Sequence, residues 1–233
     1  MTVRLNPHVI FYHIEKCAGT SLHVMLYDYF KHIYLDDEIY IPEKNNYKHY
    51  CLDEKNFFED NNFKVILGHI SVNEVISDFT EHIKIICIRH PVDRMISHYY
   101  YFDYDKYNIP LHCFTKEQLD EYISHKKAIL MRISGNTFDL VKALKNLRNI
   151  NIILIFEKLE DDVIKLNNVL NEHFKVDAHL KITKQNARVE KISCEQLEKE
   201  KECLLNSGLL DDELFIYKYI CDMNEDYRYN LKK

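Results

Sequence analysis

Four short runs of apolar residues stand out along the chain. They lie at residues 9–14, 63–69, 83–89 and 150–157. Nearly continuous apolar runs of this length are typical of strands that are buried on both faces of a parallel sheet. Between and after them the pattern predicts helices at residues 20–31, 91–103, 116–132, 137–148 and 158–174. Strands that alternate with helices indicate βαβ units, and therefore a layered α/β fold with a central parallel sheet flanked by helices.

Two long segments do not follow this alternation. Residues 32–62 are polar and aromatic with little periodicity, and we expect them to pass over the edge of the sheet. The pattern of residues 175–233 predicts no strand, only a loop followed by helices at 194–205 and 211–223. Because long loops in compact domains often contact substrates, both segments are candidate walls for an acceptor site.

Composition narrows the class of protein. A chain of 233 residues with 46% apolar residues fits a single domain over residues 1–233. No run of about 18 uncharged apolar residues is present, so we expect no stable insertion into a membrane. Seven isolated cysteines favour reduced thiols in a cytoplasmic protein over a zinc site. A net charge of −6, with basic and acidic residues intermixed, argues against a nucleic-acid partner.

The first predicted strand leads into the sequence IFYHIEKCAGTSL at residues 10–22. In parallel α/β sheets, ligands bind beyond the carboxyl ends of strands, where the start of a helix offers N–H groups and a positive dipole to an anion. The residues that would contact the anion are Lys16, Cys17, Ala18, Gly19, Thr20 and Ser21. The lysine precedes the glycine, so this is not the triphosphate loop G-x-x-x-x-G-K-S/T. In a purely structural alternative, the lysine is solvated and the hydroxyl residues only cap the helix.

A second motif reads ICIRHPVDRMISHYYYF at residues 86–102. Arg89 ends a strand, Pro91 suits a first helical position, and Ser97 follows two turns into the helix. Arginine binds phosphate bidentately, and a serine hydroxyl adds a further donor. Together the two motifs predict a ligand with anionic groups at two separate places.

The two motifs resemble those of sulfotransferases, specifically the carbohydrate group related to heparan sulfate 2-O-sulfotransferase and its bacterial relatives. That family's motifs are close to H-I-P-K-T-G-G-T-S-L and R-D-P-V-x-R-x-x-S-H-Y. The resemblance implies a P-loop-like, three-layer sulfotransferase fold and 3′-phosphoadenosine 5′-phosphosulfate (PAPS) as donor. It implies that residues 16–21 hold the 5′-phosphosulfate, that Arg89 and Ser97 hold the 3′-phosphate, and that Arg188 lies in a loop that closes over the nucleotide. Weaker similarity extends over residues 130–136, 152–170 and 209–220.

The chain departs from the family pattern at several positions. Glu15 stands in place of proline, Cys17 and Ala18 in place of Thr-Gly, and His90 in place of aspartate. A carboxylate beside Lys16 would repel a bound anion, so we expect Glu15 to turn away from the ligand. Arg94, which the family motif also contains, is expected to be structural or to pair with a surface carboxylate.

Sulfonate transfer needs an acceptor hydroxyl in line with the leaving phosphate, stabilisation of charge on the transferred group, and a base. His69 stands at the carboxyl end of the second apolar run, in VILGHIS, and histidine suits proton removal near neutral pH. The resemblance implies the same role, because the 2-O-sulfotransferases carry their base histidine in a Gly-His segment at this point. We therefore expect His69 and Lys16 to be catalytic, and no metal to be needed, because lysine and backbone dipoles neutralise the charge.

Other functions are compatible with the same motifs. A P-loop-type nucleotide kinase is disfavoured by the missing triphosphate loop and by the lack of a carboxylate that we can assign to magnesium. A binding module that has kept the nucleotide site but lost transfer is a second alternative. The expected acceptor is a carbohydrate or glycolipid, with a peptide tyrosine or a small metabolite as alternatives; no pattern in the sequence defines the oligomeric state.

Overall fold

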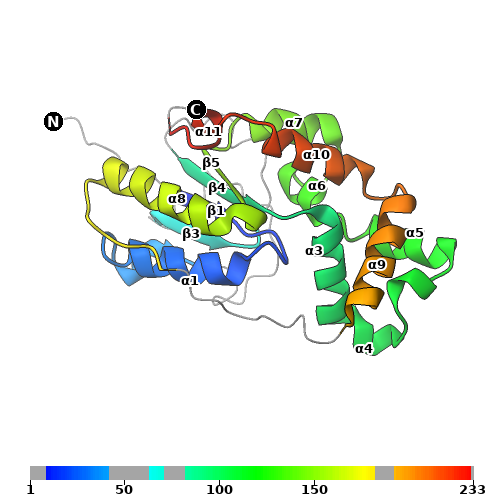
Figure 1. Cartoon of the computed structure of the whole chain (residues 1–233). Helices are drawn as coiled ribbons and strands as arrows, with labels where there is room; N and C mark the ends of the chain where they lie inside the picture. Colours follow the sequence, from blue (N-terminus) through cyan, green and yellow to red (C-terminus); the bar gives the residue numbers. More distant parts are fainter. Residues whose placement is uncertain (1–8, 42–62, 71–81, 182–191, 232–233) are drawn as a thin grey trace.

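The computed structural model describes residues 9–41, 63–70, 82–181 and 192–231. At its centre lies a five-stranded sheet with the order β2-β3-β1-β4-β5, and each neighbouring pair is parallel (Figure 1). The strands are β1 (Val9–Tyr12), β2 (Ile39–Tyr40), β3 (Val65–Gly68), β4 (Ile83–Ile88) and β5 (Ile152–Ile155). The four predicted strands are all present. Strand β2, within a segment predicted as a loop, was missed because two residues are too short to show a period.

Helices cover both faces of the sheet, which confirms the predicted layered fold. The helices are α1 (Gly19–Phe30), α3 (Pro91–His98), α4 (Tyr104–Tyr107), α5 (Lys116–Ser124), α6 (Ala128–Ile133), α7 (Leu140–Leu147), α8 (Leu159–Phe174), α9 (Cys194–Asn206), α10 (Asp211–Cys221) and α11 (Glu225–Arg228). Helices α1 and α8 pack on one face against Val9 and Phe11 of β1. Helices α6, α7 and α10 pack on the other face against Ile10 and Tyr12. Alternate residues of each strand therefore enter two separate cores.

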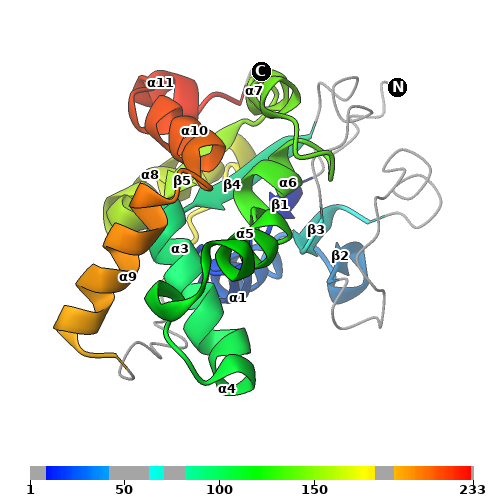
Figure 2. The same cartoon turned by 90° about the vertical axis from the view of Figure 1, so that its right-hand side faces the viewer.

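A third group of helices lies at the end of the sheet where β4 leads into α3. It contains α3, α5 and α9, with α4 beside them, and has its own apolar cluster that includes Met95, Tyr99, Ile123 and Leu204 (Figures 1 and 2). The predicted helix over residues 91–103 is interrupted here, because α3 ends at His98 and a π-helical turn, Tyr99–Asp103, follows it. The elements that succeed β4 thus extend past the carboxyl edge of the sheet.

The predicted helix over residues 116–132 is also divided, into α5 and α6. The backbone turns at residues 125–127, and there the carbonyl oxygen of Lys126 accepts a hydrogen bond of 2.5 Å from Nη2 of Arg94. That carbonyl is directed to a buried arginine on another helix. A tertiary contact therefore ends a helix that local sequence would have continued.

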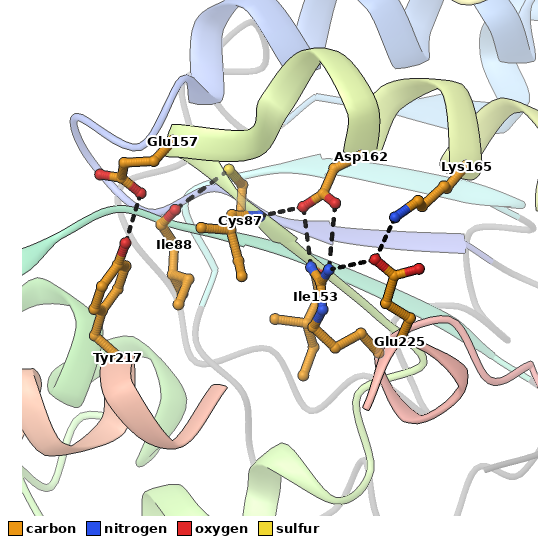
Figure 3. A network of polar contacts seen from close by, with 10 residues as sticks. Cys87, Ile88, Ile153, Glu157, Asp162, Lys165, Tyr217 and Glu225 are labelled. Carbon is orange, nitrogen blue, oxygen red and sulfur yellow. Dashed lines mark hydrogen bonds and ion pairs between the residues drawn. The ribbon is translucent and has the colours of Figure 1, made fainter. Parts of the chain in front are cut away.

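A buried ion pair joins helix α8 to the C-terminal helix α11 beside strand β5. Asp162 of α8 accepts hydrogen bonds from the backbone N–H of Ile155 at 2.7 Å and from Nη1 of Arg228 at 3.0 Å. Nearby, Nζ of Lys165 lies 2.5 Å from Oε1 of Glu225 (Figure 3). These contacts fix the edge of the sheet that is remote from β2. Among the described residues, no helix combines the length and apolar character needed to cross a membrane.

Candidate active site

Three of the predicted site residues follow three adjacent strands. Lys16 comes after β1, His69 after β3 and Arg89 after β4, and β1 lies between the other two strands. The register places Tyr12 at the end of β1 opposite Gly68 and Ile86. Because later strands are added on both sides of β1, its carboxyl end is the point where strand order reverses, and ligands bind at such points in parallel sheets.

The loop after β1 leads into α1 so that backbone N–H groups at the start of the helix can bind an anion. The N–H of Cys17 donates to the carbonyl oxygen of Ile14 at 3.3 Å, and the first helical hydrogen bond runs from the N–H of Leu22 to Ala18 at 3.0 Å. The N–H groups of Gly19 and Thr20 precede that bond and have no acceptor within the helix. They lie at the positive end of the helix dipole, which is the geometry that binds phosphate and sulfonate groups.

Gly19 is required by a neighbouring side chain. A Cβ atom at this position would lie 1.6 Å from Cδ2 and Nε2 of His13. The His13 ring in turn stacks on the ring of His69, with the centroids 3.8 Å apart and the planes at 23°. The left-handed conformations of the loop fall instead on Lys16, with φ of 66°, and on Ala18, with φ of 59°. The single glycine of the loop therefore makes room for His13, which supports His69.

Two substitutions at neighbouring positions are expected to have opposite effects on stability. Gly19→Ala places a methyl group in the His13 ring, so we expect the free energy of unfolding to fall by about 1–3 kcal/mol, as for overpacked cores. Ala18→Gly relieves a left-handed alanine, and we expect a gain of up to about 1 kcal/mol. Urea unfolding of the two variants and the wild type measures both changes. A stable Gly19→Ala protein with unaltered histidine resonances would contradict the packing of the His13 ring against Gly19.

His69 is held in one tautomer by the backbone. Its Nδ1 lies 2.9 Å from the carbonyl oxygen of His13, which can only accept a hydrogen bond, so Nδ1 carries the proton. In the neutral ring the lone pair is then on Nε2. His13 itself stays neutral, because burial, with a contribution from His69, lowers its pKa from 6.5 to about 2. The pair thus offers one proton acceptor, on His69.

Glu15 is turned towards Arg132 of α6. Oε1 of Glu15 lies 2.5 Å from Nη2 of Arg132 and 3.6 Å from Nδ1 of His69. Burial would raise the pKa of this carboxyl, but the charge and hydrogen bond of Arg132 outweigh it and, with His69, lower the pKa to about 2. The contacts of this carboxylate are thus with Arg132 and His69 and not with the cations Lys16 and Arg89. Sequence reasoning did not assign Arg132, although it lies in the segment 130–136 that resembles the family.

Lys16 and Arg89 form a pair of cations at the same loop. Nη1 of Arg89 donates to the carbonyl oxygen of Lys16 at 3.3 Å, and its guanidinium lies 4.4 Å from the ring centroid of Phe156. Nζ of Lys16 lies 3.7 Å from the ring centroid of Tyr101. Burial and the charge of Arg89 lower the pKa of Lys16. Nε of Arg89 is buried and has no hydrogen-bond partner among the described residues, so the site fits an anionic group that would accept from it.

The remaining predicted residues differ in what their side chains offer. The thiol of Cys17 faces the core, and burial raises its pKa to about 12, so only its backbone is available to a ligand. Thr20 is exposed at the start of α1, and Ser21 is half-buried beside it. Ser97 is half-buried on α3. Arg188 lies outside the described residues.

Arg94 is not on the surface. Its side chain is fully buried, and its Nη2 lies 3.7 Å from Oε2 of Glu213 on α10. The expected pairing with a surface carboxylate is therefore wrong, and a structural role fits the observed burial. The described part of the chain contains no group of three or more histidine, cysteine, aspartate or glutamate residues placed to hold a metal ion.

The fold and the site define an α/β protein that gathers a helix start, two cations and a tautomerically fixed histidine at the carboxyl edge of a parallel sheet. The chain belongs to the Sulfotransferase family, whose family model matches residues 1–201. No curated protein matches the chain. Membership places it among transferases of sulfonyl groups, which generally use PAPS as donor.

Proposed function

We propose that the protein transfers the sulfonate group of PAPS to a hydroxyl of a carbohydrate or glycolipid acceptor, with His69 as the general base. The observation that carries this proposal is the position of His69, with Nδ1 bound to a carbonyl oxygen, just after strand β3, which pairs with β1 and so lies next to the strand that leads to Lys16. An acceptor hydroxyl that approaches this edge meets a proton acceptor and a cation together. A binding module would need no proton acceptor at this edge, and a P-loop kinase would need the triphosphate loop that the sequence lacks.

The donor, when bound, supplies an activated sulfonate. In our proposal, Lys16 and the N–H groups of Gly19 and Thr20 bind the sulfonate and the adjoining phosphate, while Arg89, through its buried Nε, and Ser97 bind the 3′-phosphate. Nε2 of His69 takes the proton of the acceptor hydroxyl as its oxygen bonds to sulfur and the bond from sulfur to the leaving phosphate oxygen breaks. His69 then receives the acceptor's proton, and Lys16 stabilises the negative charge that develops on the sulfonate and the leaving phosphate oxygen.

Exposed aromatic rings beside Lys16 favour a carbohydrate acceptor. Tyr101 and Phe102 are 40% and 56% exposed, and their ring centroids lie 4.5 Å apart. Both lie in the π-helical turn after α3, and such turns are frequent at functional sites. The two rings offer apolar faces next to the ammonium group of Lys16, and binding sites for small molecules are commonly lined in this way. A peptide tyrosine could use the same rings, and a transfer screen with both kinds of acceptor separates the two.

Nucleotide preference tests the proposal first. We expect 3′-phosphoadenosine 5′-phosphate to bind more tightly than ATP in calorimetry, because the site is built for two separate anionic groups and lacks a triphosphate loop. Arg89→Gln should weaken binding about 10- to 100-fold, the range for hydrogen bonds to a charged group. Arg148→Gln, at an exposed position after α7, is the matched control and should bind normally.

A transfer screen then tests the reaction. The wild-type protein is incubated with labelled donor and a panel of glycans, glycolipids and tyrosine peptides, and the products are identified by mass. Transfer to a glycan or glycolipid is the expected result, whereas transfer to the peptides alone would reassign the acceptor. Preference for ATP in the calorimetry would favour a kinase, and tight binding of the desulfonated nucleotide without transfer to any acceptor would favour a binding module.

A further inference from the structure

Glu15 occupies an unusual environment for a carboxylate beside an anion-binding loop. It lies in the loop that follows β1, and its side chain is 21% exposed. One oxygen, Oε1, is paired with Arg132, while the other, Oε2, is buried without a hydrogen-bond partner among the described residues. A buried carboxylate oxygen that lacks a partner is unfavourable unless a nearby positive charge compensates it. His69, 3.6 Å away, is the neighbouring group that becomes positive when it accepts a proton.

We propose that Glu15 is a positioning residue for His69, held by Arg132, which stabilises the imidazolium formed when His69 accepts the acceptor proton. The inference rests on the proposed function of His69 as the base. Glu15 acts through charge, because the separation of 3.6 Å from Nδ1 is too long for a hydrogen bond and the Nδ1 proton is already donated to His13. The division of labour resembles that of other catalytic histidines, whose one nitrogen reacts while the other faces an orienting group.

Glu15 is poorly suited to be the base itself. Arg132 keeps its carboxyl ionised well below neutral pH, and such a weakly basic oxygen gives little driving force for removing a hydroxyl proton. Its nearer oxygen is already engaged by the guanidinium at 2.5 Å. A histidine side chain accepts a proton near neutral pH, and the carboxylate of Glu15 adds a counter-charge for the protonated form of His69.

Several charged or titratable groups surround His69, either in contact with it or through Glu15 and His13. Glu15 lies in the loop after β1, Arg132 on α6, and the neutral ring of His13 is stacked against His69. His23 of α1 interacts with His13. Among these described groups, Glu15 is the negative one, and Arg132 partly offsets its effect. Changing Glu15 or Arg132 should therefore move the titration of His69 in opposite directions.

The test follows the titration of His69 by NMR on the full chain, with labelled histidine and with His69→Gln to assign its resonance. In Glu15→Gln we expect the pKa of His69 to fall by about one unit, the low end of the effect of a close opposite charge, because Arg132 remains. In Arg132→Gln the pKa should rise, since the cation that offsets Glu15 is gone. Glu195→Gln removes a carboxylate from an exposed pair with Lys199 and should leave the titration unchanged.

An unchanged His69 titration in a folded Glu15→Gln protein would overturn the inference, and so would a rise in the pKa. If Glu15→Gln does not fold because Arg132 is left buried without its partner, the double variant E15Q/R132Q replaces the ion pair by two neutral amides. The inference then requires the pKa of His69 in the double variant to be lower than in the wild type; an equal or higher value would overturn it.

A second readout links the effect to turnover. Once an acceptor is known, Glu15→Gln should move the acidic limb of the kcat/KM profile to lower pH by the same amount and lower kcat above neutral pH, with the KM for the donor unchanged. A purely structural role would change neither limb selectively. The coupling of Glu15 to His69 and the proposed sulfonate transfer can be refuted independently. A shifted titration in a protein that transfers no sulfonate would keep the Glu15–His69 coupling and refute the reaction, whereas transfer with an unshifted titration would do the reverse.

Discussion

His69→Gln is expected to lower the rate of sulfonate transfer by about 10²- to 10⁴-fold, the usual contribution of a general base. The amide side chain is similar in size and can still donate to the carbonyl oxygen of His13, but it cannot accept the acceptor's proton. Affinity for 3′-phosphoadenosine 5′-phosphate should be unchanged, because His69 lies after β3 and the nucleotide phosphates are assigned to residues after β1 and β4. Single-turnover transfer with labelled donor, together with calorimetry, measures both quantities.

A control distinguishes loss of the base from a general effect of losing a histidine. His173→Gln changes an exposed residue near the end of α8 and should leave transfer at the wild-type rate. If His69→Gln binds the nucleotide normally and retains full turnover, the assignment of His69 as base is wrong. Loss of nucleotide binding together with turnover would instead show that the edge of the sheet has rearranged.

Arg94→Met should reduce the free energy of unfolding by about 3–5 kcal/mol, because it leaves the buried carboxylate of Glu213 without its cation. Both side chains are fully buried, and burial raises the pKa of Glu213 while Arg94 opposes that shift. The variant also loses the hydrogen bond to the carbonyl oxygen of Lys126, where α5 and α6 meet. Urea unfolding followed by circular dichroism measures the change.

The matched double variant tests whether the charge pair itself is the cause. Arg94→Met combined with Glu213→Gln leaves no buried ion, so most of the lost stability should return. Lys199→Met, which breaks an exposed pair with Glu195, should leave the free energy of unfolding close to that of the wild type. Wild-type stability for Arg94→Met would contradict a structural role for the pair. A double variant as unstable as the single one would show that packing, not charge, is lost.

Local sequence patterns were sufficient to predict most of the helices and strands. Runs such as residues 83–89 are buried on both faces, so their composition alone marks them as strands of a parallel sheet. The loop at residues 10–22 and the arginine at the end of β4 were recognisable because strand, loop and helix follow one another in the chain. Strand β2 and the π-helical turn after His98 were not predicted, since pairing with β3 and packing between helices decide them.

The parallel α/β fold and the residues that end its strands could be predicted from the sequence, because strand, loop and helix follow one another as local patterns. The sequence does not explain how a carboxylate, Glu15, is accommodated beside Lys16, or why the loop has a glycine only at position 19. Both are explained by tertiary contacts: α6 brings Arg132 to Glu15, and the fold places the ring of His13 against Gly19. These contacts join residues more than a hundred positions apart or depend on the direction of a ring. Pairing over such distances is set by packing, which no local pattern encodes.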